Sequence, residues 1–146
     1  MSDRALAVDA WEALFRAQVS VLRQLNLEFP TDELSLNEYD VLFNLSRQPD
    51  RKARLRELNK HLLLTQPSVS RLVDRLVDRQ LVVKESDPGD GRGTVVCLTR
   101  AGHDLFRRVA VVHAESIRRR VGGVLTPDEL AQLTVLTDKL RRGTTV

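Results

Sequence analysis

The sequence predicts a mainly α-helical protein with one small β-hairpin. Residues 55–79 carry two short amphipathic helical patterns close together, and residues 81–98 carry two β-branched runs with turn-forming residues between them. Long helical patterns flank this segment on both sides. A helix pair followed directly by a hairpin is a winged helix-turn-helix. We expect it within a single domain covering residues 1–146, with the winged helix-turn-helix lobe at about 35–99.

The first helix is expected over residues 3–28, and its apolar surface is broader than one packing contact requires. The apolar residues are Leu6, Ala10, Leu14, Ala17, Val21 and Leu25 on one side and Val8, Trp11, Phe15, Val19 and Leu22 on a neighbouring side. The next helix starts at a capping box formed by Ser35 and Glu38 and stops before Pro49.

The helix-turn-helix pair follows. Leu55, Leu58 and Leu62 share one face of its first helix, and Thr65 caps the second helix, with Pro67 in the first turn. This second helix has an apolar back of Val69, Leu72, Val73, Leu76 and Val77 and a polar front of Gln66, Ser68, Ser70, Arg71, Arg75 and Arg79. Such a front suits the major groove of DNA, although an ordinary helical pair in a bundle is the alternative.

The wing is predicted at residues 81–98. Its strands are expected at 81–85 and 94–98, and residues 86–93 between them are rich in the turn formers Pro, Gly and Asp. Arg92 at the wing tip can reach a minor groove or a phosphate group; the alternative is a solvated loop charge.

Two further helices are expected over residues 100–142. Thr99 caps the first of them, and the glycine pair 122–123 ends it. Residues 126–129, Thr-Pro-Asp-Glu, start the last helix with an N-cap, a proline in the first position and a capping-box glutamate. The apolar seam of the last helix consists of Leu130, Leu133, Leu136 and Leu140.

The wide apolar faces of the helices at 3–28 and 100–142 predict a homodimer. They would leave an exposed apolar patch on a monomer of this size. A two-fold dimer built from these helices would bury the patch; alternatively, the helices simply cap the monomer core. In the dimer, two recognition helices about 34 Å apart fit successive major grooves, so the DNA site should be an inverted repeat.

The sequence resembles the MarR family of winged helix-turn-helix repressors from about Trp11 to Leu140. The resemblance rests on residues 55–58 (Leu-Arg-Glu-Leu), 68–76 (Ser-Val-Ser-Arg-Leu-Val-Asp-Arg-Leu), 90–93 (Asp-Gly-Arg-Gly) and 98–102 (Leu-Thr-Arg-Ala-Gly), in the family's order and spacing. It implies a homodimeric DNA-binding regulator that is usually released from DNA by a small ligand or an oxidant. It also implies that Asp90 holds the wing or orients a neighbouring arginine, although Asp-Gly is also a simple turn signal.

The net charge of +3 is unevenly distributed along the chain. Residues 51–80 hold eight basic and three acidic side chains, a net +5, so the remainder carries a net −2. Excess positive charge beside a predicted recognition helix is typical of phosphate binding, although a solvated helix face explains part of it.

The predicted DNA-binding residues divide by role. Those expected to read bases from the first turns of the recognition helix are Gln66, Ser68, Ser70 and Arg71. Further along this helix, Arg75 and Arg79 are expected to contact phosphates or to pair with Asp74 and Asp78. The remaining backbone and wing candidates are Arg54, Lys60, Thr65, Asp90 and Arg92.

A small organic effector is expected in a pocket between the dimer helices and the DNA-binding lobe, as the resemblance implies. The candidate wall residues are Trp11, Phe15, Tyr39, Phe43 and His113, each of which is otherwise an ordinary core residue. An aromatic or phenolic ligand bound there would change the separation of the two recognition helices and so shift DNA affinity.

No cofactor and no metal site are expected. Glu57 and His61 form an isolated i, i+4 pair, and His103 and His113 lie ten residues apart, so no cluster of ligands is formed. Cys97, the single cysteine, lies in an apolar strand, where a small buried thiol is its expected role and a redox role the alternative.

Two classes of protein are excluded by missing patterns. The chain has no glycine-rich phosphate loop and no readable Ser/His/Asp or Cys/His arrangement, so we do not expect an enzyme. No segment approaches the roughly 18 apolar residues of a membrane span, and no signal core follows Met1, so we expect a cytoplasmic protein without membrane partners.

The predicted function is a homodimeric transcriptional repressor that binds an inverted-repeat operator and is released by a small ligand. The alternative is a winged-helix module that binds protein without sequence-specific DNA binding. The basic face and the wing argue against this module, whereas binding that is indifferent to salt would favour it. The operator sequence, the effector and the regulated genes are not specified by these patterns.

Overall fold

The computed structural model describes residues 2–62 and 66–144, without the side chains of His61 and Gln66, and the chain divides into two compact units. We call Met1–Glu28 together with His113–Val146 the terminal unit, and Phe29–Val112 the central unit. The central unit contains the predicted lobe 35–99 and extends beyond it on both sides. Helix α5 (Arg100–Ile117) contributes residues to both units.

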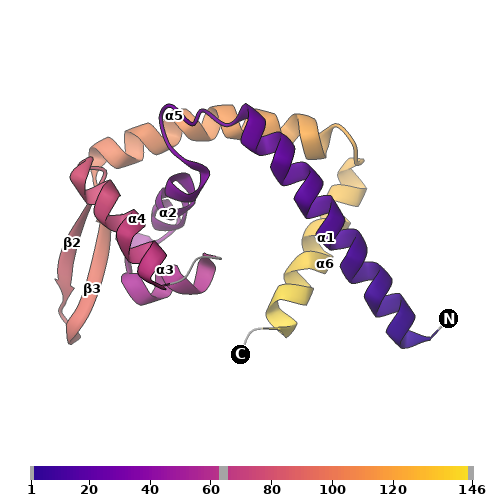
Figure 1. Cartoon of the computed structure of the whole chain (residues 1–146), viewed down its shortest axis with the longest axis horizontal. Coiled ribbons are helices and arrows are strands. Elements are labelled where there is room, and N and C mark those ends of the chain that lie inside the picture. The colour runs from indigo at the N-terminus through magenta and orange to yellow at the C-terminus, as the bar shows by residue number, and fades with distance from the viewer. Residues whose placement is uncertain (1, 63–65, 145–146) are drawn as a thin grey trace. The chain divides into compact units, whose positions relative to one another are not determined.

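The central unit has the predicted helices and hairpin in the predicted order, together with a short 3-10 helix and a short strand that the sequence did not predict (Figure 1). They are α2 (Leu36–Ser46), the short 3-10 helix η1 (Pro49–Arg51), β1 (Lys52–Arg54), α3 (Leu55–His61), α4 (Gln66–Asp78), β2 (Val82–Asp87), β3 (Asp90–Leu98) and the first part of α5. The strands form one antiparallel sheet in the order β1-β3-β2. A mainly helical fold with a hairpin wing after a helix-turn-helix is thereby confirmed.

Both predicted capping boxes are present. At α2, Ser35 Oγ accepts the N–H of Glu38 at 3.0 Å, and the Glu38 carboxylate accepts the N–H of Ser35 at 2.9 Å. Thr126 and Glu129 exchange the same two hydrogen bonds at the start of α6 (Pro127–Gly143), at 3.2 and 2.9 Å. The backbone N–H of Thr126, which the Glu129 carboxylate accepts, and the Thr126 side chain lower the pKa of Glu129. Each box satisfies donors that a helix leaves unpaired in its first turn.

The wing has longer strands than the sequence suggests. The pattern places a turn at residues 86–93, but β2 continues to Asp87 and β3 begins at Asp90, so that only Pro88 and Gly89 connect them. The predicted turn was wrong in extent because strand pairing uses backbone groups, which Gly and Asp supply as well as Val does. Ser86 therefore pairs with Thr94 and Asp87 with Asp90, and the register irregularity between these two pairs leaves residues 91–93 opposite no residue of β2.

The sheet has a third strand that the sequence pattern does not predict. In β1, Lys52 lies opposite Cys97 of β3, and Arg54 lies opposite Val95. Three residues are too few for a two-residue alternation to be recognised. Because β1 leads directly into α3, it connects the helix-turn-helix to the wing.

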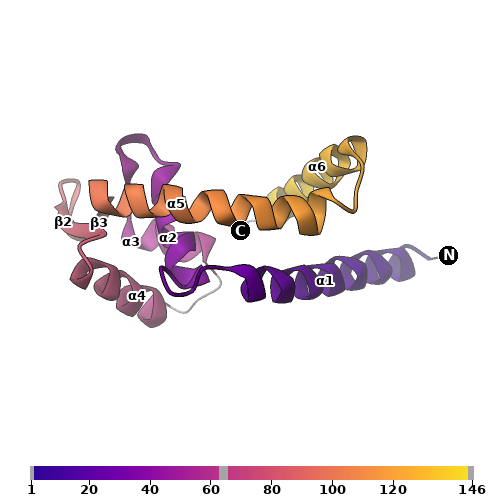
Figure 2. The same ribbon diagram turned by 90° about the horizontal axis from the view of Figure 1, so that it is seen from above.

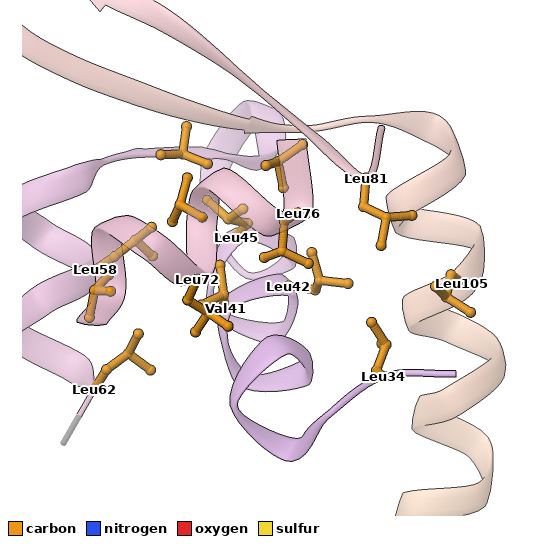
Figure 3. Close-up of a cluster of buried hydrophobic side chains, with 14 of the residues drawn as sticks. Leu34, Val41, Leu42, Leu45, Leu58, Leu62, Leu72, Leu76, Leu81 and Leu105 are labelled. Atoms are coloured by element: carbon orange, nitrogen blue, oxygen red, sulfur yellow. The ribbon is translucent and has the colours of Figure 1, made fainter. Parts of the chain in front are cut away.

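The core of the central unit consists of leucine and valine side chains from the helices and the sheet (Figure 3). The residues of α4 in this core are Val69, Leu72, Val73 and Leu76, all at most 2% exposed. In Figure 3, Leu72 and Leu76 lie in one cluster with Val41, Leu42 and Leu45 of α2. The predicted apolar back of α4 is confirmed, and its burial fixes which face of α4 points outward.

The start of α5 is joined tightly to the end of α4. The N–H of Leu81 donates to the carbonyl of Leu76 at 3.0 Å, and Gln80 takes a positive φ of 61° to close the helix. Thr99 Oγ1 donates to the Leu81 carbonyl at 3.0 Å and accepts the N–H of Gly102 at 3.0 Å, which confirms Thr99 as the cap of α5. Gly102 thus packs directly against the backbone at Leu81.

The terminal unit contains α1 (Asp3–Glu28), the last residues of α5, the π-helical turn η2 (Arg118–Gly122) and α6 (Pro127–Gly143). Figure 2 shows α1 as one continuous helix. Neither α1 nor α6, both fully described, has a buried residue. The large exposed apolar side chains of this unit are Leu6, Val8, Trp11, Phe15, Leu22, Leu27, Ile117, Val124, Leu133, Val135, Leu136 and Leu140. This surface is as wide as the sequence predicts.

Glu28, the last residue of α1, is held by two arginines of η2. Its carboxylate oxygens lie 2.5 Å from Arg119 Nη2 and 2.5 Å from Arg120 Nε. The two guanidinium groups lower the pKa of Glu28 from 4.5 to about 2. The two ion pairs of Glu28 therefore link α1 to η2 at neutral pH.

We expect Glu28→Gln to remove a pH-dependent part of the free energy of unfolding. Because the pKa of Glu28 is lowered in the folded state, its carboxylate stabilises the fold above the unfolded value of 4.5, and this contribution is lost as the pH falls from 4.5 to about 2. Urea unfolding should be measured from neutral pH down to about 2. The free energy of unfolding of the variant should be lower than that of the parent at neutral pH and equal to it at the acid end. Glu12→Gln, which breaks only an exposed pair with Arg16 at 3.7 Å, is the control. A difference that does not change with pH would contradict this role of Glu28.

Candidate nucleic-acid interface

The outward face of α4 carries the side chains that the sequence assigns to base reading. Arg71 and Arg75 are exposed, and Ser68 and Ser70 are half-buried beside them. Arg71 Nη2 donates to Ser68 Oγ at 3.4 Å, one turn earlier on the helix. Thr65 and the Gln66 side chain, two further predicted contacts, lie outside the described part of the chain. The described polar residues therefore form one continuous outward stripe.

Four exposed arginines of the central unit, two of them in this stripe, form no ion pair with any described residue. They are Arg56 of α3, Arg71 and Arg75 of α4, and Arg92 of β3. Their positive charges are uncompensated and so available to phosphate groups. Arg56 is not among the sequence predictions. Its only signal was its place in the basic segment 51–80, because nothing in the local pattern distinguishes it from a solvated helix charge.

Arg54, by contrast, is paired within the protein. Its Nε lies 2.7 Å from Asp87 Oδ2, and the Asp87 side chain is only 4% exposed. The other carboxylate oxygen of Asp87 accepts the N–H of Gly89 at 2.9 Å. Sequence reasoning missed Asp87, although its position directly before Pro88-Gly89 is a turn signal. One carboxylate thus connects the turn of the wing to the residue that precedes α3.

A notch of about 200 Å³ separates the start of α3 from the wing. Its lining includes three arginines, Arg54, Arg56 and Arg92, and two carboxylates, Asp87 and Asp90. The Asp90 carboxylate accepts the N–H of Arg92 at 3.1 Å, so Asp90 shapes the backbone that carries Arg92. With Asp87 neutralised by Arg54, the edge of the notch has a positive balance.

Arg79, at the end of α4, faces the protein. Its Nη1 lies 3.3 Å from Glu38 Oε2, and its Nη2 donates to the Glu33 carbonyl at 2.8 Å. The sequence suggested Asp74 or Asp78 as ion-pair partners, but Arg79 pairs with neither of them. Arg79 therefore ties α4 to the segment that leads into α2.

Two further ion pairs lie at this surface. Asp74 of α4 pairs with Lys84 of β2, which links the recognition helix to the wing. Lys60, a predicted backbone contact, lies 3.3 Å from Glu57 on the same helix, and both side chains are largely exposed. Such an exposed pair adds little to folding and leaves Lys60 free to exchange Glu57 for a phosphate.

We expect Arg79→Ala to lower the free energy of unfolding by about 1 kcal/mol and to change DNA affinity by less than about twofold, because its contacts lie within the protein. Arg75→Ala is the matched control on the same helix: it should weaken DNA binding and leave stability unchanged. Urea denaturation and a DNA titration on both variants would check this. A large loss of affinity in a stable Arg79→Ala protein would contradict the assignment.

The aromatic effector candidates lie in two groups. In the central unit, Tyr39 lies 6.2 Å from Phe43 and 5.3 Å from Phe106, measured between ring centroids. In the terminal unit, Trp11 and Phe15 contact each other at 5.7 Å, and both rings are about half exposed. The fifth candidate, His113, is also in the terminal unit.

Burial shifts the pKa of three groups singled out from the sequence. It raises the pKa of the Tyr39 hydroxyl and lowers that of the His113 imidazole, which favours the neutral forms of both. It also raises the pKa of Cys97, as does the charge of neighbouring Glu85, so the thiolate is disfavoured. In the described part of the chain, no three or more His, Cys, Asp or Glu residues are grouped to hold a metal ion. No described helix is both long and apolar enough to cross a membrane.

Part of the chain is similar to known protein sequences. Residues 33–93, from before α2 into β3, match the model of the MarR family. YkoM of Bacillus subtilis, an uncharacterised HTH-type transcriptional regulator, is 35% identical over 86 residues, which are 59% of this chain and 55% of YkoM. The chain thus spans about half the length of this relative.

Two solved structures extend the similarity to the whole chain. Sco3205, a MarR family transcriptional regulator from Streptomyces coelicolor solved in complex with DNA, matches with a TM-score of 0.82 and 26% identity over 100% of this chain and 91% of that one. BpsR of Bordetella bronchiseptica matches with a TM-score of 0.77 and 27% identity over 91% of this chain and 98% of that one. DNA binding by BpsR is regulated by 6-hydroxynicotinic acid.

Proposed function

We propose that this chain acts as a transcriptional regulator of the MarR type and binds an operator sequence in double-stranded DNA. The observation that carries the proposal is the outward face of α4. Its apolar back is buried, so Arg71 and Arg75 are presented outward together with Ser68 and Ser70. An arginine can read guanine through two hydrogen bonds, and small polar side chains allow the helix to approach the base edges. No catalytic role is assigned to the chain.

The wing and the helix before α4 supply the sequence-independent contacts in this proposal. Arg92 reaches a minor groove or a phosphate, and Arg56 and Lys60 contact the DNA backbone near the start of α3. These exposed cations are the groups whose counterion exchange makes binding depend on salt.

We further propose that the active form is a homodimer held by the terminal unit. The exposed apolar side chains of α1 and α6, with Trp11 56% and Leu136 63% exposed, support it. A groove of about 500 Å³ between α1, η2 and α6 is lined mainly by apolar residues, among them Leu14, Val21 and Leu133. A surface of this kind is typical of a subunit interface. A two-fold dimer would present two α4 helices to successive major grooves of an inverted repeat.

Regulation by a small aromatic ligand completes the proposal, with the protein acting as a repressor in the cytoplasm. The regulation of BpsR by an aromatic acid supports this. The candidate ligand contacts are Trp11, Phe15, Tyr39, Phe43 and His113. A ligand that binds the DNA-free arrangement more tightly than the DNA-bound one would release the operator.

The test is a fluorescence-anisotropy titration with DNA from the region next to the protein's own gene, against scrambled competitor and at several salt concentrations. We expect an inverted repeat to be bound about a thousandfold more tightly than random DNA near physiological salt. Weak binding without sequence preference would contradict a sequence-specific regulator. Partner binding that is indifferent to salt would instead favour a protein-interaction module.

The ligand arm of the proposal is tested on the same complex. Addition of aromatic or phenolic acids should release the operator from the parent protein. Alanine variants of Tyr39, Phe43 and His113 that still fold should need more ligand for release. Release at unchanged ligand concentration in all three variants would exclude these residues as the binding site.

A further inference from the structure

The wing carries Arg92 beyond the part of the sheet that β1 supports. The pairing of β1 with β3 ends at Arg54 opposite Val95, so residues 86–94 form a ribbon of two strands only. A two-stranded ribbon by itself is marginally stable in water and twists easily. A DNA contact at its tip therefore needs something that fixes the ribbon against the helices.

We propose that Arg54 and Asp87 are a positioning pair for DNA binding: their ion pair fixes the wing, and with it Arg92, against the helix-turn-helix. The inference rests on the proposed function and deepens it, because Arg54 then acts through Asp87 and not through a phosphate contact of its own. It also assigns a DNA-binding role to an acidic residue.

Asp87 has the geometry that such a role requires. Its Oδ2 lies 2.7 Å from Arg54 Nε, and its Oδ1 accepts the N–H of Gly89 at 2.9 Å. With only 4% of its side chain exposed, this carboxylate has lost most of its contact with water, so both oxygens depend on these protein partners. It sits at the register irregularity after Ser86, where the ladder alone does not set the path of the strand.

Gly93 makes room for the pair, and Gly89 lies beside it. A Cβ atom at Gly93 would lie 3.0 Å from Asp87 Cβ and 3.2 Å from its Oδ2. A Cβ atom at Gly89 would lie 3.6 Å from Arg54 Nη2, which places the guanidinium group beside the turn. The wing therefore closes around the ion pair, and a side chain at Gly93 would push Asp87 away from it.

Arg54 can transmit this position because it belongs to two elements. It is the last residue of β1 and the residue that precedes the first turn of α3. A bond from its side chain to Asp87 therefore holds the turn of the wing to the base of the helix-turn-helix. The pair of Asp74 with Lys84 is a second link, from α4 to β2.

The sign of the effect distinguishes positioning from simple charge. Asp87→Asn makes the surface more positive by one charge, and if charge alone mattered, DNA binding would become tighter. It keeps an oxygen for the N–H of Gly89 but removes the anionic partner of Arg54. If the pair positions the wing, binding becomes weaker instead. Glu85→Gln, an exposed residue on the same strand, makes the same charge change as a matched control.

The experiment measures operator affinity by fluorescence anisotropy for full-length variants. If the freed wing is correctly placed about a tenth of the time, Asp87→Asn weakens binding about tenfold per half-site, whereas Glu85→Gln leaves it equal or tighter. Arg54→Met should weaken the parent and cause no further loss in the Asp87→Asn background. Arg71→Ala should keep its full effect there, because α4 is undisturbed. Tighter binding by Asp87→Asn, or independent losses from the two positions, would overturn the proposal.

Hydrogen exchange without DNA provides the second measurement. We expect Asp87→Asn to speed exchange of the wing amides at residues 90–95 and to leave the amides of α4 unchanged. If the parent shows no operator preference, the proposed function fails, and hydrogen exchange alone tests whether the Arg54–Asp87 ion pair fixes the wing. Unchanged exchange of the wing amides in Asp87→Asn would then overturn that claim. If Asp87→Asn does not fold, Arg54→Met, which keeps the turn contact of Asp87, takes its place in both measurements.

Discussion

Replacing Arg71 with alanine is expected to weaken operator binding about a hundredfold and to leave the stability of the protein unchanged. A bidentate arginine contact to guanine discriminates by about 1–3 kcal/mol, roughly tenfold or more, and a dimer loses two such contacts. Arg71 is exposed, and within the described part of the chain its one hydrogen bond is the 3.4 Å contact with Ser68 Oγ, so the fold loses little with it. Anisotropy titrations with operator and random DNA, together with urea denaturation, would measure both quantities.

The control for Arg71 is Arg16→Ala, which removes one positive charge from α1. The Arg16 side chain is 81% exposed, and among the described residues it forms an ion pair with Glu12 of the same helix alone. Its loss should change operator affinity little and should not change the preference over random DNA. An equal loss in both variants would mean that Arg71 contributes only general charge, and its role in reading bases would be excluded.

Replacing Gly102 with alanine is expected to lower the free energy of unfolding by about 2–3 kcal/mol. An added Cβ atom would lie 2.0 Å from the carbonyl oxygen of Leu81 and 2.9 Å from Leu98 Cδ1, so the start of α5 would have to move. In an open helical position, the same change stabilises by about 1 kcal/mol, because glycine is a poor helix former. At Gly102 the close contacts reverse the sign of this change, so alanine destabilises the protein. Urea denaturation would measure the difference.

Gly143→Ala provides the matched control in α6. Apart from its chain neighbours and the backbone of its own helix, no atom of the described residues would lie within 4 Å of a Cβ at this position, so alanine should be neutral or slightly stabilising. If Gly102→Ala proved as harmless as Gly143→Ala, the close packing of α5 on the Leu81 backbone would be refuted. Near-ultraviolet circular dichroism at low temperature would show whether the Gly102→Ala protein still reaches a packed state.

Features that depend on neighbouring residues were predictable from the sequence. The capping boxes at Ser35 and Thr126 were predicted because donor and acceptor lie three positions apart. The apolar back of α4 follows from a period that a helix imposes on any sequence. These local rules established the type and order of the elements and identified the outward face of α4.

Features that depend on distant residues were not predictable in the same way. Arg79 and Glu38 are separated by 41 positions, and no periodicity indicates which opposite charges will meet. The same holds for Arg54 and Asp87, so the sequence assigned Arg54 to DNA and overlooked Asp87. Strand β1 was missed because its three residues acquire their conformation from pairing with β3. The sequence could nominate basic residues for the site, but not show which of them pair within the protein.

The ion pair of Asp74 with Lys84 has a consequence for how binding data are interpreted. Both side chains are substantially exposed, 55% and 38%, so dissolved ions screen their attraction. The slope of binding against salt is commonly converted into a number of phosphate contacts. Because this ion pair helps to hold the wing, added salt also weakens the attachment of the wing to α4. The salt dependence of binding then includes the loss of an ion pair within the protein, and the number of phosphate contacts derived from the slope is too large.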